Sequence, residues 1–164
     1  MPSLGNEATV SGTDVWLTPP ALLKSLGEFD LDPCSPLNRP WDTAKHHYTI
    51  EDDGLAQDWF GRVWCNPPYG PGMAPFLRRV VEHGNAMVLI FARTETKAFF
   101  DYVWDHADAI LFIKGRLSFH TPDGGKGGTA GSPSVLIAYG EENVKALENC
   151  GIEGRLVYLD RRRN

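Results

Sequence analysis

The motif Asn66-Pro67-Pro68-Tyr69, which directly follows the short apolar run Val63–Cys65, is the part of the sequence best suited to chemistry. Two successive prolines cannot continue a hydrogen-bonded strand, and each fixes its own φ, so the chain must leave the predicted strand in one defined direction. The side-chain amide oxygen of Asn66 and the carbonyl oxygen of Pro67 can then face one small space, where neither prolyl nitrogen carries a competing N–H. With the ring of Tyr69 beside them, two acceptors and a stacking surface suit a planar substrate that carries an amino group.

This motif resembles the Asn-Pro-Pro-Tyr signature of methyltransferases that use S-adenosylmethionine to methylate an exocyclic or amide nitrogen. The lone pair of an adenine amino group is delocalised into the ring, so the nitrogen is a poor nucleophile. Acceptors at Asn66 and Pro67 that bind both N–H bonds favour the pyramidal nitrogen of the transition state. Tyr69 would stack on the base, a contact worth about 1–3 kcal/mol, and its electron-rich face would tolerate a sulfonium cation. A turn that only leads a strand into a helix has the same sequence, so the rest of the chain must decide.

Short apolar runs alternate with amphipathic segments along the chain, and this order predicts an α/β fold. Strands are expected at residues 29–32, 62–65, 86–92, 109–113, 133–139 and 155–159, with at most a short strand near 47–50, and helices are expected near 18–27, 75–84, 96–105 and 141–149. The continuous apolar run 86–92 is typical of a strand buried on both faces of a parallel sheet. Together with the resemblance, the pattern predicts a mostly parallel sheet with helices on both faces, a reduced Rossmann-like class I methyltransferase fold.

Three polar side chains fall at the ends of predicted strands. Asp32 ends the first strand, Asn66 follows the second and Arg93 follows the apolar run 86–92. Because ligands bind at the carboxyl ends of strands in such sheets, we expect these side chains to converge.

The first segment expected to bind the cofactor is Trp16-Leu17-Thr18-Pro19-Pro20. It is similar to the Thr-Pro segment that many amino-methyltransferases place over the methionine part of S-adenosylmethionine. The resemblance implies cofactor contacts at Trp16, Thr18 and Pro19. Thr18 taken alone equally fits a simple N-cap of the helix that follows.

The second cofactor segment, Asp30–Cys34, is similar to the strand-end Asp-Pro segment of adenine methyltransferases. This resemblance implies that Asp32, next to Pro33, holds the α-amino end of S-adenosylmethionine. The glycine-rich turn that usually follows is replaced here by Ser35–Asn38. Asp53, in an acidic turn, is a further candidate for the ribose hydroxyls or the adenine amino group of the cofactor, although acidic turns are commonly only solvated.

Two more segments, Phe91–Thr96 and Gly115–Phe119, complete a series of five in the order seen in a small family of phage-encoded DNA N6-adenine methyltransferases. The chain resembles this family over roughly residues 14–140. The resemblance implies that Arg93 and Thr94 line the substrate pocket and that Phe119 packs on an adenine flipped out of the duplex. Phe119 would equally fit an ordinary core position.

The glycine-rich stretch Gly124–Gly131 is expected to be a loop between two strands. It lacks the Gly-Lys-[Ser/Thr] ending and the strand-to-helix context of a phosphate-binding loop, so a P-loop nucleotide site is excluded. Lys126, with Arg116 nearby in the sequence, would instead contact the DNA backbone. The alternative interpretation is a flexible connector.

Composition and charge limit the class of protein. Of 164 residues, 42% are hydrophobic, and the longest apolar run is too short to span a bilayer. With no secretory signal, a cytoplasmic location in a bacterial host and no membrane partner are expected. Three cysteines without Cys-x-x-Cys spacing indicate free thiols and no metal site. The net charge is −5, concentrated in residues 1–61, which suits a cationic ligand there or simply a solvated acidic surface.

The sequence therefore predicts a loose N-terminus at residues 1–13, one methyltransferase domain at 14–160 and a basic tail at 161–164. The predicted activity is site-specific methylation of adenine N6 in duplex DNA with S-adenosyl-L-methionine as cofactor. So small a chain has no room for a separate target-recognition domain. We therefore expect a short recognition sequence, loose sequence specificity, or specificity supplied by a second subunit, and a homodimer is possible. Two alternatives stay open: the same transfer to RNA or a protein glutamine, and a non-catalytic homologue that binds nucleic acid.

Overall fold

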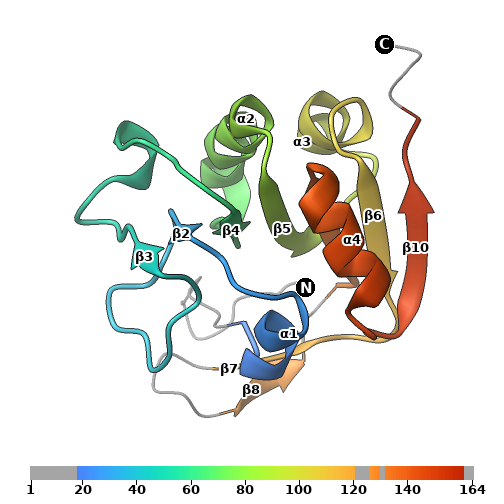
Figure 1. Cartoon of the computed structure of the whole chain (residues 1–164), viewed down its shortest axis with the longest axis horizontal. Coiled ribbons are helices and arrows are strands. Elements are labelled where there is room, and N and C mark those ends of the chain that lie inside the picture. Colours follow the sequence, from blue (N-terminus) through green and yellow to red (C-terminus); the bar gives the residue numbers. More distant parts are fainter. Residues whose placement is uncertain (1–17, 121–125, 130–131, 161–164) are drawn as a thin grey trace.

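The computed structural model describes residues 18–120, 126–129 and 132–160, and the side chains of 18–117 and 132–160. In chain order the elements are α1 (Pro20–Ser25), β2 (Leu31–Asp32), β3 (His46–His47), η2 (Gly54–Ala56), β4 (Val63–Cys65), η3 (Gly70–Gly72), α2 (Met73–His83), β5 (Ala86–Phe91), α3 (Lys97–Phe99), η4 (Phe100–Trp104), β6 (Ala109–Ile113), β7 (Ser118–His120), β8 (Lys126–Thr129), β9 (Ser134–Tyr139), α4 (Glu141–Asn149) and β10 (Gly154–Tyr158). Helices cover a central sheet, and the β7–β8 hairpin lies at the lower end of the view with α1 (Figure 1). Within the described residues, no helix combines the length and apolar character needed to cross a bilayer.

The described residues form a seven-stranded sheet in the order β10-β6-β9-β5-β4-β2-β3. The strands β3, β2, β4 and β5 pair in parallel. In contrast, β9 is antiparallel to both of its neighbours, β5 and β6, and β10 is antiparallel to β6. Because β9 reverses direction between them, β5 and β6 run the same way.

The predicted α/β class is confirmed, but the predicted mostly parallel sheet is not. Three of the six pairings between neighbouring strands are antiparallel, and these form the three longest ladders. The physical reason is the connection between β6 and β9, whose described residues contain the β7–β8 hairpin and no helix. A parallel neighbour requires a long crossover, usually a helix, whereas a chain that returns directly beside its own strand runs antiparallel.

The central strands β4, β5, β6 and β9 are buried on both faces because their residues alternate between two apolar layers. One layer joins Trp64 and Met87 to apolar residues of α1 and α4. The other layer joins Val63 and Val88 to apolar residues of α2, α3 and η4. Every residue of β4 is therefore buried, and the chain directly after β4 is held at a fixed place at the sheet edge.

A buried polar cluster holds the opposite, amino end of β4 and β5. The guanidinium of Arg62, just before β4, donates to the side-chain oxygen of Asn143 at 2.7 Å and to the carbonyl of Glu28 at 3.0 Å. Asn143 in turn donates to the side chain of Asn85, just before β5, at 2.8 Å. These bonds tie α4 to two neighbouring strands, so their carboxyl ends are fixed relative to each other.

Two local predictions were wrong. Pro19, not Thr18, is the N-cap of α1, and it makes no side-chain hydrogen bond. The predicted loop around Gly124–Gly131 contains β8, which pairs with β7. Glycine disfavours strands, so the sequence pattern did not indicate this ladder, which is made by backbone atoms alone.

Candidate active site

The strand order reverses at β2. From β2 the chain continues to β3 on one side, and it then returns to β4 on the other side. At such a switch point the loops after two adjacent parallel strands diverge and leave a crevice at their carboxyl ends. A cavity of about 740 Å³ lies at this place. Its volume is within the range of roughly 300–1,000 Å³ that is typical of small-molecule sites.

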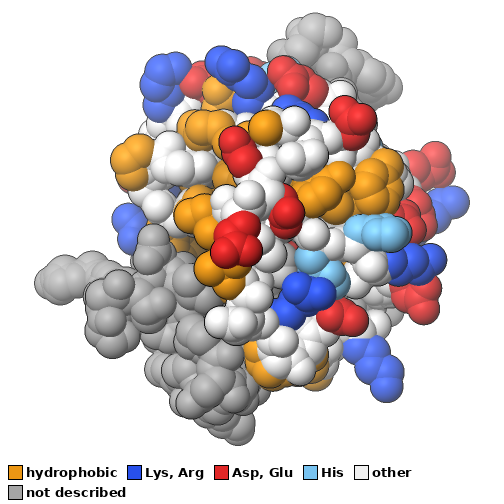
Figure 2. Space-filling view, turned by 90° about the vertical axis from the view of Figure 1, so that its left-hand side faces the viewer, with side chains coloured by type: hydrophobic (Ala, Val, Ile, Leu, Met, Phe, Trp, Pro, Cys, Tyr) orange, Lys and Arg blue, Asp and Glu red, His pale blue; other side chains and the backbone are white. Residues whose placement is uncertain are grey.

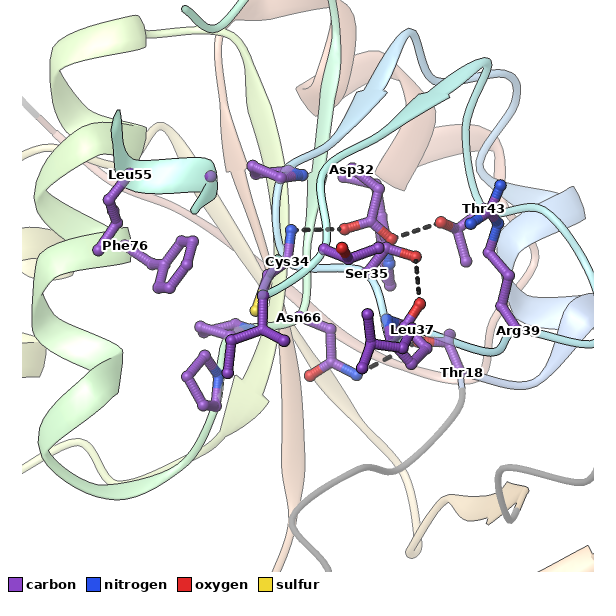
Figure 3. Close-up of a pocket in the computed structure, with 18 of the residues that line it drawn as sticks. Thr18, Asp32, Cys34, Ser35, Leu37, Arg39, Thr43, Leu55, Asn66 and Phe76 are labelled. Carbon is purple, nitrogen blue, oxygen red and sulfur yellow. Dashed lines mark hydrogen bonds between the residues drawn. The ribbon is translucent and has the colours of Figure 1, made fainter. Parts of the chain in front are cut away.

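The cavity walls come from the segments after β2, β3 and β4 and from α2 (Figure 3). Much of the lining is apolar, including Leu37, Ile50, Leu55 and Phe76. The lining residues that were predicted from the sequence are Thr18, Asp32, Pro33, Asp53, Asn66, Pro67, Pro68 and Tyr69. The structure therefore brings the two predicted halves of the site, cofactor and substrate, into one space.

Asp32, the last residue of β2, is a buried carboxylate in the cavity wall, only 3% exposed. One oxygen accepts the backbone N–H of Cys34 at 3.0 Å, and the other accepts the hydroxyl of Thr43. Burial raises the pKa of the Asp32 carboxyl from 3.8 to about 6, although the two hydrogen bonds and the charge of Arg39 oppose the rise. Within the described residues, no basic group forms an ion pair with Asp32. A cationic ligand would stabilise the ionised form.

Asn66, the first residue after β4, is half-buried and faces the same cavity. Its side-chain nitrogen donates to the hydroxyl oxygen of Thr18 at 3.3 Å, and Thr18 is itself buried. The side-chain oxygen of Asn66 points away from Thr18 (Figure 3). The hydroxyl of Thr18 therefore orients the amide of Asn66. As a helix N-cap, the same hydroxyl would instead have accepted a backbone N–H of the first turn of α1.

Tyr69 lines the cavity with one aromatic face covered from behind. Its ring stacks on the ring of Phe91, at the end of β5, with a centroid distance of 4.6 Å and an angle of 5° between the planes. Tyr69 is a lining residue and Phe91 is not. Burial raises the pKa of the Tyr69 phenol well above its usual range, so the ring is neutral at physiological pH.

The acidic turn after β3 closes another side of the cavity. Asp53 adopts a left-handed conformation with φ of +57°, and Gly54 follows it. A Cβ on Gly54 would lie 2.0 Å from the carbonyl oxygen of Pro33, so only glycine lets this turn approach the segment after β2 so closely. The indole of Trp59 donates to the carbonyl of Gly54 at 2.9 Å and holds the turn in place.

The edge of the molecule that carries β3 and this turn mixes acidic and apolar surface (Figure 2). Glu51, Asp52 and Asp53 are exposed there, and the side chain of Ile50 is 83% exposed. The acidic character of the first third of the sequence thus reaches the mouth of the cavity. Within the described residues, no group of His, Cys, Asp and Glu side chains is placed to hold a metal ion.

A family model described as DNA N-6-adenine-methyltransferase (Dam) matches residues 5–148. The chain belongs to the Dam family. The resemblance inferred from its motifs is therefore confirmed, and the matched region contains every residue that lines the cavity. Membership supports adenine N6 methylation as the general activity and DNA as the substrate. No curated protein and no solved structure matches the chain.

Several residues predicted for this Dam-family site do not line the cavity. Arg93 and Thr94 follow β5 outside it, where the Arg93 guanidinium donates to the hydroxyl of Ser132 at 3.0 Å. Arg116 is exposed in the loop after β6, and Pro19 lies beside Thr18 without lining the cavity. Their predicted contacts with DNA or cofactor stay predictions.

Three further predictions fall outside the described part of the structure. Trp16 lies before residue 18. The backbones of Phe119 and Lys126 belong to β7 and β8, but their side chains are not among those described. Their proposed packing on a base and contact with the DNA backbone stay predictions.

The residues of this Dam-family cavity that were not identified from the sequence include Arg39, Trp41, Thr43 and Phe76. The first three lie in the connection between β2 and β3, which was interpreted only as turn-rich. Their position in the sequence could have indicated them, because a connection that directly follows a strand in an α/β sheet begins at the ligand-binding edge. Phe76 lies one turn into α2, seven positions after Tyr69, and its helical pattern indicated only a core residue.

Proposed function

We propose that this protein transfers a methyl group from S-adenosylmethionine to N6 of adenine in DNA. The observation that carries the proposal is the shared cavity of Asp32 and Asn66, which end or follow two adjacent parallel strands. A carboxylate suited to a cationic cofactor and an amide suited to an amino group thereby face one space. Membership of the Dam family supports adenine in DNA as the group that is methylated.

The residues of the cavity fit S-adenosylmethionine. Asp32 is a buried carboxylate with an elevated pKa, and within the described part of the chain it accepts hydrogen bonds only from Cys34 and Thr43, so it retains acceptor capacity for an ammonium group. The apolar wall near Leu55 and Phe76 suits an adenosine ring system, and Asp53 at the edge suits its hydroxyl or amino groups. When bound, the cofactor supplies a methyl group activated by a positively charged sulfur.

In this proposal the chain acts on the adenine through hydrogen bonding and positioning. Asn66 and the carbonyl of Pro67 accept the two N–H bonds of the amino group and stabilise the pyramidal nitrogen of the transition state. Thr18 keeps the amide of Asn66 in the required orientation. Tyr69 stacks on the base through the face that Phe91 leaves open. The amino group of a paired base is out of reach, so the adenine is flipped out of the duplex.

We also infer that the sheet is a reduced Rossmann-like methyltransferase fold. Five strands, β3, β2, β4, β5 and β6, share one direction, and the cavity lies at the switch point beside β2. The loops after β5 and β6 leave the same edge of the sheet as the loop after β4. We therefore propose that Arg93, Thr94 and Arg116, together with Phe119 and Lys126 of the hairpin, contact the DNA around the flipped adenine.

Transfer of radiolabelled methyl from S-adenosylmethionine to unmethylated duplex DNA, followed by nucleoside analysis, tests the proposal. The Asn66→Ala protein, assayed in parallel, serves as the matched control for contaminating methyltransferases. Label in N6-methyladenine with wild type only supports the proposal. Label that appears only with RNA or with a glutamine-containing peptide, or a protein that does not bind S-adenosylmethionine at all, overturns it.

A further inference from the structure

One cation lines a cavity that otherwise carries negative charge. Among the described lining residues, Arg39 is the only lysine, arginine or histidine, and Asp32 and Asp53 are the carboxylates. Arg39 lies in the connection between β2 and β3, on the same side of the cavity as Asp32 and Thr43 (Figure 3). Leu55 and Phe76 lie at the opposite side (Figure 3). The cavity therefore has a polar end with both charge signs and an apolar end.

The guanidinium of Arg39 is bound on one side and keeps N–H donors for a ligand. Its side chain is 29% exposed, and its Nε binds the carboxylate of Asp42 at 3.1 Å. Within the described part of the chain, the two terminal nitrogens of Arg39 make no further hydrogen bond. A guanidinium in this state presents two parallel N–H donors, the geometry that matches a carboxylate.

We propose that Arg39 binds the α-carboxylate at the methionine end of S-adenosylmethionine while Asp32 binds the α-ammonium. This inference rests on the proposed function. A zwitterionic amino acid needs one anion and one cation close together, and the polar end of the cavity supplies one of each. The adenosine part then lies toward Leu55 and Phe76, and the sulfonium lies between the two ends, where Asn66 faces the cavity.

Arg39 also compensates for a departure from the usual sequence. The segment after Asp32 and Pro33 lacks a glycine-rich turn, whose backbone N–H groups can form an anion-binding concavity. Here the same connection supplies a guanidinium instead, and its Asp42 partner holds it. The positive charge of Arg39 lowers the pKa of Asp32, so the cation also favours the ionised carboxylate that the ammonium requires.

Calorimetric binding of two ligands tests the inference without any methyl transfer: S-adenosylmethionine and its decarboxylated analogue, which lacks only the carboxylate. We expect wild type to bind S-adenosylmethionine about tenfold or more tightly than the analogue, because a charged hydrogen-bonded pair is lost. Arg39→Met should bind the two ligands with similar affinity, and Arg39→Lys should keep part of the preference. Arg78→Met, which removes an exposed arginine of α2 outside the cavity, is the matched control and should keep the full preference.

Several outcomes overturn the inference. The inference is wrong if wild type binds S-adenosylmethionine and the decarboxylated analogue with equal affinity. It is also wrong if the Arg39→Met protein keeps the full preference for S-adenosylmethionine. Both results leave the proposed function intact as long as S-adenosylmethionine binds. Failure of wild type to bind S-adenosylmethionine removes the proposed function and this inference together. Far-ultraviolet circular dichroism of each variant confirms that differences in affinity arise in folded protein.

Discussion

The ring centroids of Tyr69 and Phe91 lie 4.6 Å apart and the ring planes are within 5° of parallel, although Tyr69 follows β4 and Phe91 is the last residue of β5. Tyr69 faces the cavity and Phe91 lies behind it, at the end of β5. A ring that is supported on one face keeps a fixed plane, and a base that stacks on the other face meets a surface already in place. In the proposed function, the stack is therefore a preorganised platform for the adenine base.

Replacing Phe91 by leucine keeps an apolar side chain and removes the supporting ring. Aromatic pairs contribute about 0.5–1.5 kcal/mol beyond the burial of their area, so kcat/KM for DNA should fall by about two- to tenfold. Phe91→Tyr should restore it, and the affinity for S-adenosylmethionine should not change. Phe112→Leu, a ring of β6 in the other apolar layer, is the control. A Phe91→Leu protein with lower thermal stability but normal kcat/KM would show that the stack is only structural.

Asn66→Ala removes the acceptor that we propose acts on the substrate nitrogen. We expect methyl transfer to fall by about 10²- to 10³-fold, the cost of losing one acceptor or donor aimed at the transition state. Affinity for S-adenosylmethionine should change little, because Asp32 and the other cavity residues remain. Single-turnover transfer and calorimetry measure the two quantities separately. Near-normal transfer by this variant would remove Asn66 from the catalytic assignment.

The elevated pKa of Asp32 makes stability depend on pH. Folding raises this pKa from 3.8 to about 6, mainly through burial, so the folded state favours the protonated carboxyl. The associated stabilisation is complete below about pH 4 and is lost as pH rises through about 6, a change of about 3 kcal/mol. Asp32→Asn lacks this dependence and should be the more stable protein at pH 7. Urea unfolding of both proteins between pH 4 and 7 measures the effect. A difference in the free energy of unfolding that stays constant over this pH range would contradict the prediction.

The same carboxyl predicts the opposite trend for cofactor binding. Only the ionised form of Asp32 attracts an ammonium group, so affinity for S-adenosylmethionine should rise by about tenfold between pH 5 and pH 7. Asp32→Asn should bind weakly at both pH values. Calorimetry of the two proteins at both pH values provides the measurement. An unchanged wild-type affinity across this range would exclude Asp32 as the group that binds the ammonium.

Gly54→Ala tests the close contact between the acidic turn and the segment after β2. The new Cβ would lie 2.0 Å from the carbonyl oxygen of Pro33, so the two walls of the cavity must move apart. We expect a loss of about 1–3 kcal/mol in the free energy of unfolding and roughly tenfold weaker binding of S-adenosylmethionine. Gly84→Ala is the control, because it meets nothing within 4 Å and strains only a backbone with φ of +80°. It should lower stability without changing affinity.

Local patterns in the sequence identified most elements and several of the residues that line the cavity. The apolar run before Asn66 and the two prolines after it require a strand that ends at that point, and the same holds for Asp32 before Pro33. These are short-range effects of backbone geometry, so they could be inferred without knowing the rest of the fold. The family resemblance depended on the same segments and their order.

Other features required the tertiary structure. The antiparallel insertion of β9 between β5 and β6 follows from a connection whose described residues form a hairpin and no helix, and the glycine-rich β8 gave no strand pattern. Arg39 and Thr43 appeared to be ordinary turn residues until the connection between β2 and β3 was placed over Asp32. Each of these features depends on which segments, far apart in the sequence, lie side by side in the fold. Hydrophobic periodicity carries no information about such contacts.

By itself, the sequence determined the family, the α/β class and the two strand ends that bear Asp32 and Asn66, because residue type and spacing along a short segment decide these properties. Only the tertiary structure decided that Thr18 orients Asn66, that Phe91 supports Tyr69 and that Arg39 shares a cavity with Asp32. The hydrogen bond between Thr18 and Asn66 spans 48 positions of the chain. Contacts of that separation arise from the packing of the sheet as a whole, in which one buried core fixes the distances between all the strand ends.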